Sequence, residues 1–167
     1  MEKIKISLAI LLPEIPDERD ACVQRLISIA QRQRGIEKVH LVPKDGDSDA
    51  QFCFHYDPDI ISMNQIQHLA QEAGASITHK YRHLLIDIGG IRDMMQAAFV
   101  EKEIRAIKGV EEVSVSAAGP ASLEYDQSET NKQKILDAIS RYKLTIKTVV
   151  SSKIDKYPAT TGLDEEP

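Results

Sequence analysis

The chain has 167 residues, a hydrophobic fraction of 42% and a formal net charge of −5 at pH 7, which allows one ordinary domain or two small ones. The acidic balance excludes a strongly basic surface for nucleic acid. The apolar run near the start is too short to span a membrane, and no small-residue cleavage pattern of a signal peptide follows it. Two cysteines, Cys22 and Cys53, are too few for a disulfide framework. We therefore expect a cytosolic chain with reduced thiols.

The first half of the chain alternates strand and helix patterns. In chain order we predict a strand near 3–12, a helix near 18–34, strands near 36–43 and 50–57, a helix near 62–73 and a strand near 75–81. Gly35 stands where the first helix ends, because a helix C-cap commonly needs the positive φ that glycine adopts most easily. The polar segment 44–49 predicts a hairpin loop between the two middle strands.

The second half repeats this order. We predict elements near 83–89, 92–107, 111–117, 120–126, 129–141 and 143–149, with the same strand and helix types in the same sequence. The glycine-led segment 34–42 is echoed by 108–116, and the strand that ends in Tyr56-Asp57 is echoed by one that ends in Tyr125-Asp126. The chain therefore contains two copies of one module.

A βαββαβ string folds as a four-stranded antiparallel sheet with both helices on one face. The predicted fold class is therefore α+β, with two tandem ferredoxin-like domains at 1–81 and 82–150. The remaining segment, 151–167, lacks periodicity and is predicted to be a flexible tail or linker.

The glycine-led and Tyr-Asp segments resemble those of heavy-metal-associated domains, which occur in copper chaperones and in tandem at the cytosolic N-termini of heavy-metal-transporting P-type ATPases. The resemblance rests on Gly-Ile-Glu-Lys-Val at 35–39, Tyr-Asp-Pro at 56–58 and Gly-Val-Glu-Glu-Val at 109–113. It covers nearly the whole chain. It implies a ferredoxin-like fold and a bound metal ion such as zinc or copper. It also implies that the chain is attached to a membrane only through a parent transporter.

The sequence departs from that family at the metal-binding loop, where the family carries Cys-x-x-Cys. The two cysteine positions fall on Arg19 and Cys22 in the first half and on Asp93 and Gln96 in the second. Soft cations need soft ligands, and neither loop offers a pair of thiolates. We therefore predict that the usual metal-ferrying role is lost in both halves, although Asp93 offers one hard oxygen ligand.

A different set of possible ligands lies on the middle strands of the first half. Cys53 and His55 are two residues apart and share a strand face, which alternation predicts to be the solvent-facing one. If the hairpin is roughly symmetric, His40 lies beside Cys53 on the neighbouring strand. His40, Cys53 and His55 are therefore a candidate site for zinc or copper; the alternative is a sheet face that carries these residues by chance.

Cys22 begins an amphipathic helix, where it is either a partly buried apolar residue or a thiol with a lowered pKa near a helix N-terminus, aided by Arg19. It is a second candidate metal ligand. Met94 and Met95 occupy the place between the lost cysteines of the second half, and they are typical of a contact patch.

The sequence shows no nucleophile and base pair, phosphate loop or clustered carboxylates, and it predicts no enzyme active site. The leading hypothesis is a regulatory docking region of a heavy-metal-transporting P-type ATPase, with the pump's cytosolic domains as partner. The alternatives are a free-standing protein-interaction or ligand-sensing module, and a metal-binding domain with a non-standard His/Cys site.

Overall fold

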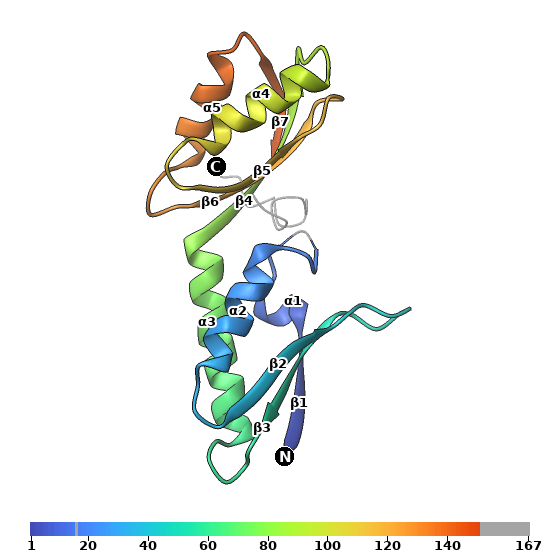
Figure 1. Cartoon of the computed structure of the whole chain (residues 1–167), viewed down its shortest axis with the longest axis vertical. Coiled ribbons are helices and arrows are strands. Elements are labelled where there is room, and N and C mark those ends of the chain that lie inside the picture. The colour runs from blue at the N-terminus through green and yellow to red at the C-terminus, as the bar shows by residue number, and fades with distance from the viewer. Residues whose placement is uncertain (16, 151–167) are drawn as a thin grey trace, which may run out of the picture. The chain divides into compact units, whose positions relative to one another are not determined.

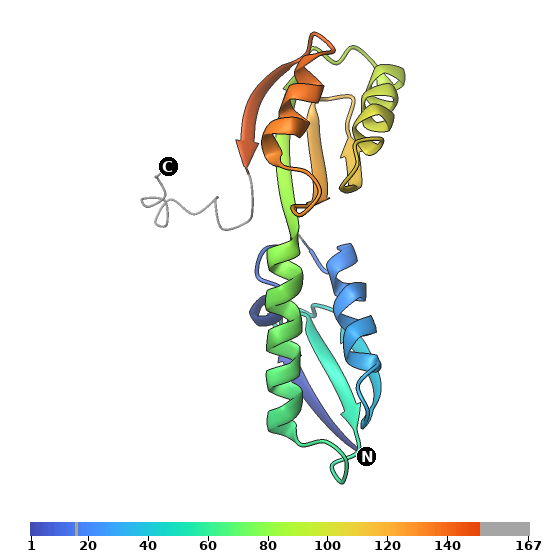
Figure 2. The same cartoon turned by 90° about the vertical axis from the view of Figure 1, so that its left-hand side faces the viewer.

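The computed structural model describes residues 1–15 and 17–150, and the chain divides into a first unit, Met1–His79, and a second unit that begins at Lys80. Figures 1 and 2 show the elements of both units from two sides. The predicted tail at 151–167 lies outside the described residues. None of the helices described here is both long enough and apolar enough to cross a membrane.

The first unit is a three-stranded antiparallel sheet with helices on one face (Figure 1). Its elements are β1 (Glu2–Ser7), α1 (Leu8–Leu11), α2 (Ala21–Gln31), β2 (Ile36–Val42), β3 (Gln51–Tyr56) and α3 (Met63–Lys80), and β3 is the central strand. Phe52 and Phe54 of β3 are fully buried, as are Leu26 of α2 and Ile66 of α3. Burial of these side chains fixes which face of the sheet the helices cover.

The predicted strand at 75–81 is wrong, because α3 continues through this segment to Lys80. The buried residues Ile66, Ala70, Ala73 and Ile77 recur at intervals of three and four, which is the spacing of one helical face. The helical period therefore extends past the predicted end at residue 73. As a consequence, the first sheet has three strands where four were predicted.

The predicted strand at 3–12 is also too long, because its second half forms the short helix α1. This helix lies directly against α3, where a Cβ added at Gly74 would overlap the carbonyl oxygen of Leu11. The absence of a side chain at Gly74 lets the two backbones approach each other. The segments that depart from the predicted pattern thus pack together.

The second unit has the complete predicted order. Its elements are β4 (Tyr81–Gly89), α4 (Met94–Arg105), β5 (Val110–Val115), β6 (Pro120–Asp126), α5 (Lys132–Ser140) and β7 (Thr145–Val150), with strand order β5-β6-β4-β7. Figure 2 shows both helices on one face of this sheet. The core brings together Leu84, Val100, Leu123 and Ile135, from both helices and the sheet. The predicted α+β class with tandem ferredoxin-like units is confirmed, with the fourth strand present only in the second unit.

The duplicated glycines make the same connection in both units. Gly35 and Gly109 have φ values of 99° and 100°, and their carbonyl oxygens accept hydrogen bonds from the backbone N–H groups of Asp57 and Asp126, at 2.9 Å and 2.7 Å. A positive φ of this size is rarely adopted by residues with a side chain. The repeated sequence motif therefore corresponds to the same positive-φ turn and the same backbone hydrogen bond in both units.

Candidate metal centre

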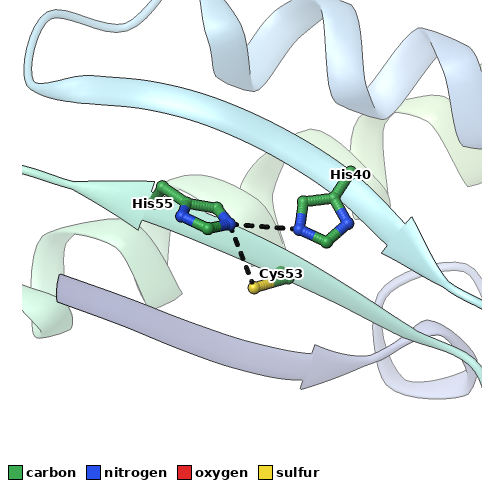
Figure 3. A group of neighbouring side chains, drawn as sticks. All are labelled: His40, Cys53 and His55. Atoms are coloured by element: carbon green, nitrogen blue, oxygen red, sulfur yellow. Dashed lines mark hydrogen bonds between the residues drawn. The ribbon is translucent and has the colours of Figure 1, made fainter. Parts of the chain in front are cut away.

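The candidate ligands of the first unit are brought together by the pairing of β2 with β3. His40 lies directly opposite Cys53 in this antiparallel register, and His55 follows two residues later on β3. Directly opposite residues have their side chains on the same side of a sheet. All three therefore lie on the open face, which we define as the sheet face turned away from α2 and α3, and Figure 3 shows them there.

The ligand atoms of these side chains converge. The two Nε2 atoms of His40 and His55 are 3.1 Å apart, and Cys53 Sγ lies 3.7 Å from His55 Nε2 (Figure 3). One ligand atom from each of the three residues can be chosen so that all lie within 4.8 Å of one another. The adjacency of His40 and Cys53 that the hairpin predicted is thus present in the structure.

This spacing fits a tetrahedral ion. With Zn–N bonds of about 2.0–2.1 Å and a Zn–S bond of about 2.3 Å, two nitrogen ligands would lie about 3.4 Å apart and a nitrogen and a sulfur about 3.6 Å apart. The His40–His55 and Cys53–His55 distances of 3.1 Å and 3.7 Å are close to these values, and the third pair of ligand atoms lies within 4.8 Å. Two imidazoles and one thiolate suit a borderline cation such as Zn(II).

The predicted exposure of Cys53 is wrong. Its thiol is on the open face, but the residue is only 2% exposed. Cys53 is on the central strand, between Lys5 and His40 directly opposite on either side, and His55 follows on its own strand. These longer side chains surround the small thiol, whereas His40 and His55 remain partly exposed.

The electrostatic surroundings favour the neutral form of His55. Partial burial is the largest cause, and the His40 ring and the ammonium groups of Lys3 and Lys38 add to it, so that the pKa of His55 lies below its ordinary value of 6.5. A metal-binding imidazole must be neutral, with a lone pair on the ligating nitrogen. The surroundings therefore hold His55 in the protonation state that coordination requires.

Cys22 lies at the start of α2, as predicted, and it is buried with 1% exposure. Its backbone N–H donates to the Asp20 carboxylate at 2.8 Å, and Arg25 Nη1 lies 3.3 Å from its sulfur. Arg19, which was expected to act on this thiol, instead pairs with Asp17 at 3.1 Å. The cation nearest the thiol along the helix is thus Arg25.

In the second unit, Asp93 is the N-cap of α4, and its carboxylate accepts a hydrogen bond from the Gln96 backbone N–H at 2.8 Å. This contact gives the carboxylate a structural role at the helix start. Met94 and Met95 follow it and are 78% and 83% exposed. Their side chains are available for contact, as the sequence suggested.

The second unit lacks the ligand set at the equivalent positions of its own sheet. Ser114 lies directly opposite Ser122, where the first unit has His40 opposite Cys53. Two hydroxyl groups are poor ligands for a borderline cation compared with a thiolate and an imidazole. The duplicated folds have therefore diverged on the open face.

Sequence reasoning missed Lys3, Lys5 and Lys38 as part of this site. The structure pairs Lys3 and Lys38 with His55 from the two flanking strands, and it pairs Lys5 with Cys53. Alternation within the first strand signals that Lys3 and Lys5 share one face. Only the register between strands shows that this is the face of the candidate ligands.

No model of a known protein family matches the sequence, and no curated protein matches it. Among solved structures, the N-terminal extension of CzcP from Cupriavidus metallidurans is 37% identical, with a TM-score of 0.78, and the match covers 84% of this chain and 95% of that one. The fold and this likeness define a tandem of ferredoxin-like units of the heavy-metal-associated type. The chain belongs to the family of tandem heavy-metal-associated domains represented by this CzcP extension.

More distant likenesses also occur. The N-terminal soluble domains of Bacillus subtilis CopA are 18% identical, with a TM-score of 0.38, over 87% of this chain and 92% of that one. Oxidized MerP from Ralstonia metallidurans is 21% identical, with a TM-score of 0.37, over 41% of this chain and 99% of that one. At these identities and TM-scores the two likenesses add nothing further.

Proposed function

We propose that the chain is the cytosolic N-terminal region of a heavy-metal-transporting P-type ATPase, and that it regulates the pump by docking against its cytosolic domains. The observation that carries the proposal is the 37% identity with the CzcP N-terminal extension, over 95% of that chain. Delivery of metal through a Cys-x-x-Cys loop is not part of this role, because Cys22 and Cys53 are the only cysteines and are far apart in the sequence.

The experiment begins with the natural reading frame. Under the proposal it continues past Pro167 into apolar spans of about 20 residues each. A stop codon at this point would overturn the transporter assignment in favour of a free-standing interaction module. This test needs no assumption about the metal.

The second step compares the full transporter with a variant that lacks residues 1–150, both in membrane vesicles. Regulation predicts that the truncated pump still hydrolyses ATP, with a changed dependence of turnover on the metal concentration. Loss of all turnover despite normal insertion would indicate an essential delivery role. Identical metal dependence of the two proteins would overturn the regulatory role.

We further propose that the region senses a divalent metal ion through His40, Cys53 and His55. The supporting observation is the convergence of two imidazole nitrogens and one sulfur within 4.8 Å. The ion itself is the ligand being sensed, and the chain supplies one thiolate and two neutral imidazoles to hold it.

This site is tested by titrating the full chain with Co(II) and Zn(II) under reducing conditions. Binding should show thiolate-to-cobalt charge-transfer bands and should weaken at least about 10-fold in Cys53→Ser and in His55→Asn. His68→Asn, at an exposed histidine of α3, is the matched control and should bind as tightly as the unmodified chain. Loss of binding in Cys22→Ser but not in Cys53→Ser would overturn the assignment.

A further inference from the structure

The open face of the first unit has an unusual charge for a surface that is to hold a cation. Two rows of directly opposite residues cross this face from β1 through β3 to β2. One row is Lys3, His55 and Lys38, and the other is Lys5, Cys53 and His40. Lys3, Lys5 and Lys38 are exposed cationic side chains. Each lies directly across the sheet from a candidate ligand, where Cβ atoms are about 4.5–5.5 Å apart.

The six residues of these two rows include no carboxylate that could balance the lysines. The next row of the register consists of Ser7, Gln51 and Val42, which are neutral. A divalent ion bound to one thiolate and two neutral imidazoles keeps one positive charge, and the three lysines add three more. Like charges at this distance oppose binding. With only these three protein ligands, the bound ion and the lysines keep a net positive charge. The fourth position of the tetrahedron also stays open.

The equivalent face of the second unit shows that lysines are not a requirement of the fold. The positions that correspond to Lys3, Lys5 and Lys38 are His83, Leu85 and Glu112, by the same pairing with the central strand. The lysines thus occur on the sheet that carries the thiol and the two imidazoles, and the corresponding positions of the other sheet carry none.

We propose that this site binds its metal ion together with a small carboxylate anion from solution. One carboxylate oxygen occupies the fourth coordination position, and the other accepts hydrogen bonds from the lysine ammonium groups. A carboxylate suits both partners, because its oxygens are ordinary zinc ligands and form charge-assisted hydrogen bonds with lysine. The inference rests on the proposed metal site and names the second ligand that completes it.

The test measures the affinity of the full chain for Co(II) with increasing acetate, at an ionic strength held constant with perchlorate. The apparent affinity should rise about 10-fold or more with saturating acetate, and the visible d–d bands of cobalt should change as the fourth ligand is replaced. An equal response to chloride would overturn the choice of carboxylate, because a spherical anion cannot bridge the metal and a lysine through two atoms.

The variant that tests the lysines replaces Lys3, Lys5 and Lys38 together with glutamine. Without acetate it should bind Co(II) more tightly than the unmodified chain, since the repulsion is removed, and its response to acetate should fall to about 2-fold or less. The matched control replaces Lys102, Lys108 and Lys134, three exposed lysines of the second unit, with glutamine and should behave like the unmodified chain. Equal acetate responses in both triple variants would overturn the role of the lysines.

The result also separates the two proposals. Cobalt binding with thiolate bands but no acetate dependence would overturn this inference and leave the metal site standing. Absence of cobalt binding with and without acetate would overturn the metal site, and the inference with it. Circular dichroism of each variant checks that the fold is intact, which is expected because substitutions of exposed residues usually change stability little.

Discussion

The Nε2 atoms of His40 and His55 lie 3.1 Å apart on neighbouring strands of the first unit. At this separation one nitrogen donates its proton and the other accepts it, so two charged rings cannot share the contact. A metal ion that binds both Nε2 atoms of the neutral rings replaces this hydrogen bond, and the proton of the donor ring moves from Nε2 to Nδ1 so that each Nε2 offers a lone pair. This relationship motivates the first two predictions.

The first prediction concerns acid sensitivity of the first unit. Partial burial, His40, Lys3 and Lys38 lower the pKa of His55 in the folded state below the 6.5 of the free side chain, so the unfolded chain binds its proton first as the pH falls. Stability is therefore unaffected above about pH 6.5 and decreases as the pH falls from there through the folded-state pKa. His55→Gln should flatten this decrease in urea unfolding curves.

Several charged or titratable groups surround this ring: His40 and Lys38 on β2, Lys3 on β1, and Cys53 on its own strand. His68→Gln removes an exposed histidine and serves as the control, with an unchanged pH profile expected. A profile of the unmodified chain that is flat between pH 5 and pH 7, at about the precision of unfolding curves, would contradict the assignment of this titration.

The second prediction concerns metal removal. An ion that binds only the folded chain stabilises it by about 2.7 kcal/mol when its free concentration is 100 times the dissociation constant. Zn(II) should therefore raise the unfolding midpoint of the first unit, and a chelator should reverse the rise. Cys53→Ser should show a much smaller rise of the midpoint at the same zinc concentration, because its binding is weaker. A full zinc-dependent rise in this variant would place the bound ion elsewhere.

The third prediction concerns the duplicated glycine. Gly35 has a φ of 99°, and a Cβ added there would lie 2.8 Å from the Ile61 Cγ2 atom and 2.9 Å from that of Ile60. Gly35→Ala should therefore destabilise the first unit by about 2–3 kcal/mol through backbone strain and steric overlap together.

The matched comparison for that variant is Gly46→Ala, in the hairpin loop. Gly46 also has a positive φ, of 58°, but an added Cβ there has no neighbour within 4 Å. Only the backbone strain remains, so a smaller loss of about 1 kcal/mol is expected in denaturant unfolding. Equal losses for the two variants would show that the contact with Ile61 relaxes without penalty.

The fourth prediction concerns acid unfolding of the second unit. Hydrogen bonds from Ser128, whose hydroxyl donates to the Asp126 carboxylate at 2.6 Å, hold the pKa of Asp126 below its ordinary value of 3.8, and Lys80 adds to the effect. The stability that this shift contributes is present above about pH 3.8 and is lost as the pH falls through the folded-state pKa.

Asp126→Asn should therefore lower stability at neutral pH by about 1–2 kcal/mol, because a charged acceptor of hydrogen bonds becomes neutral. The difference between this variant and the unmodified chain should shrink in acid, as measured by unfolding at pH 7 and pH 3. Asp137→Asn changes an exposed carboxylate of α5 and should alter stability by less than about 0.5 kcal/mol. A constant difference for Asp126→Asn at both pH values would contradict the linkage.

Sequence patterns predicted the second unit well, since each of its strands and helices lies within a few residues of its predicted place. They failed at the end of α3. A strand was inferred at 75–81, although Ile77 continues the helical spacing set by Ile66, Ala70 and Ala73. Local propensity is weak, and the burial of one helical face against the sheet decided the outcome.

The sequence by itself determined the duplication, the ferredoxin-like class and the absence of a Cys-x-x-Cys pair, because repeats, hydrophobic periods and residue identities are all local properties of a chain. Only the tertiary structure decided that His40, Cys53 and His55 converge, that Cys53 is buried, and that Lys3, Lys5 and Lys38 surround them. The physical reason is register. A shift of one residue in a strand pairing moves every side chain to the other face of the sheet, and packing of the whole unit fixes that register.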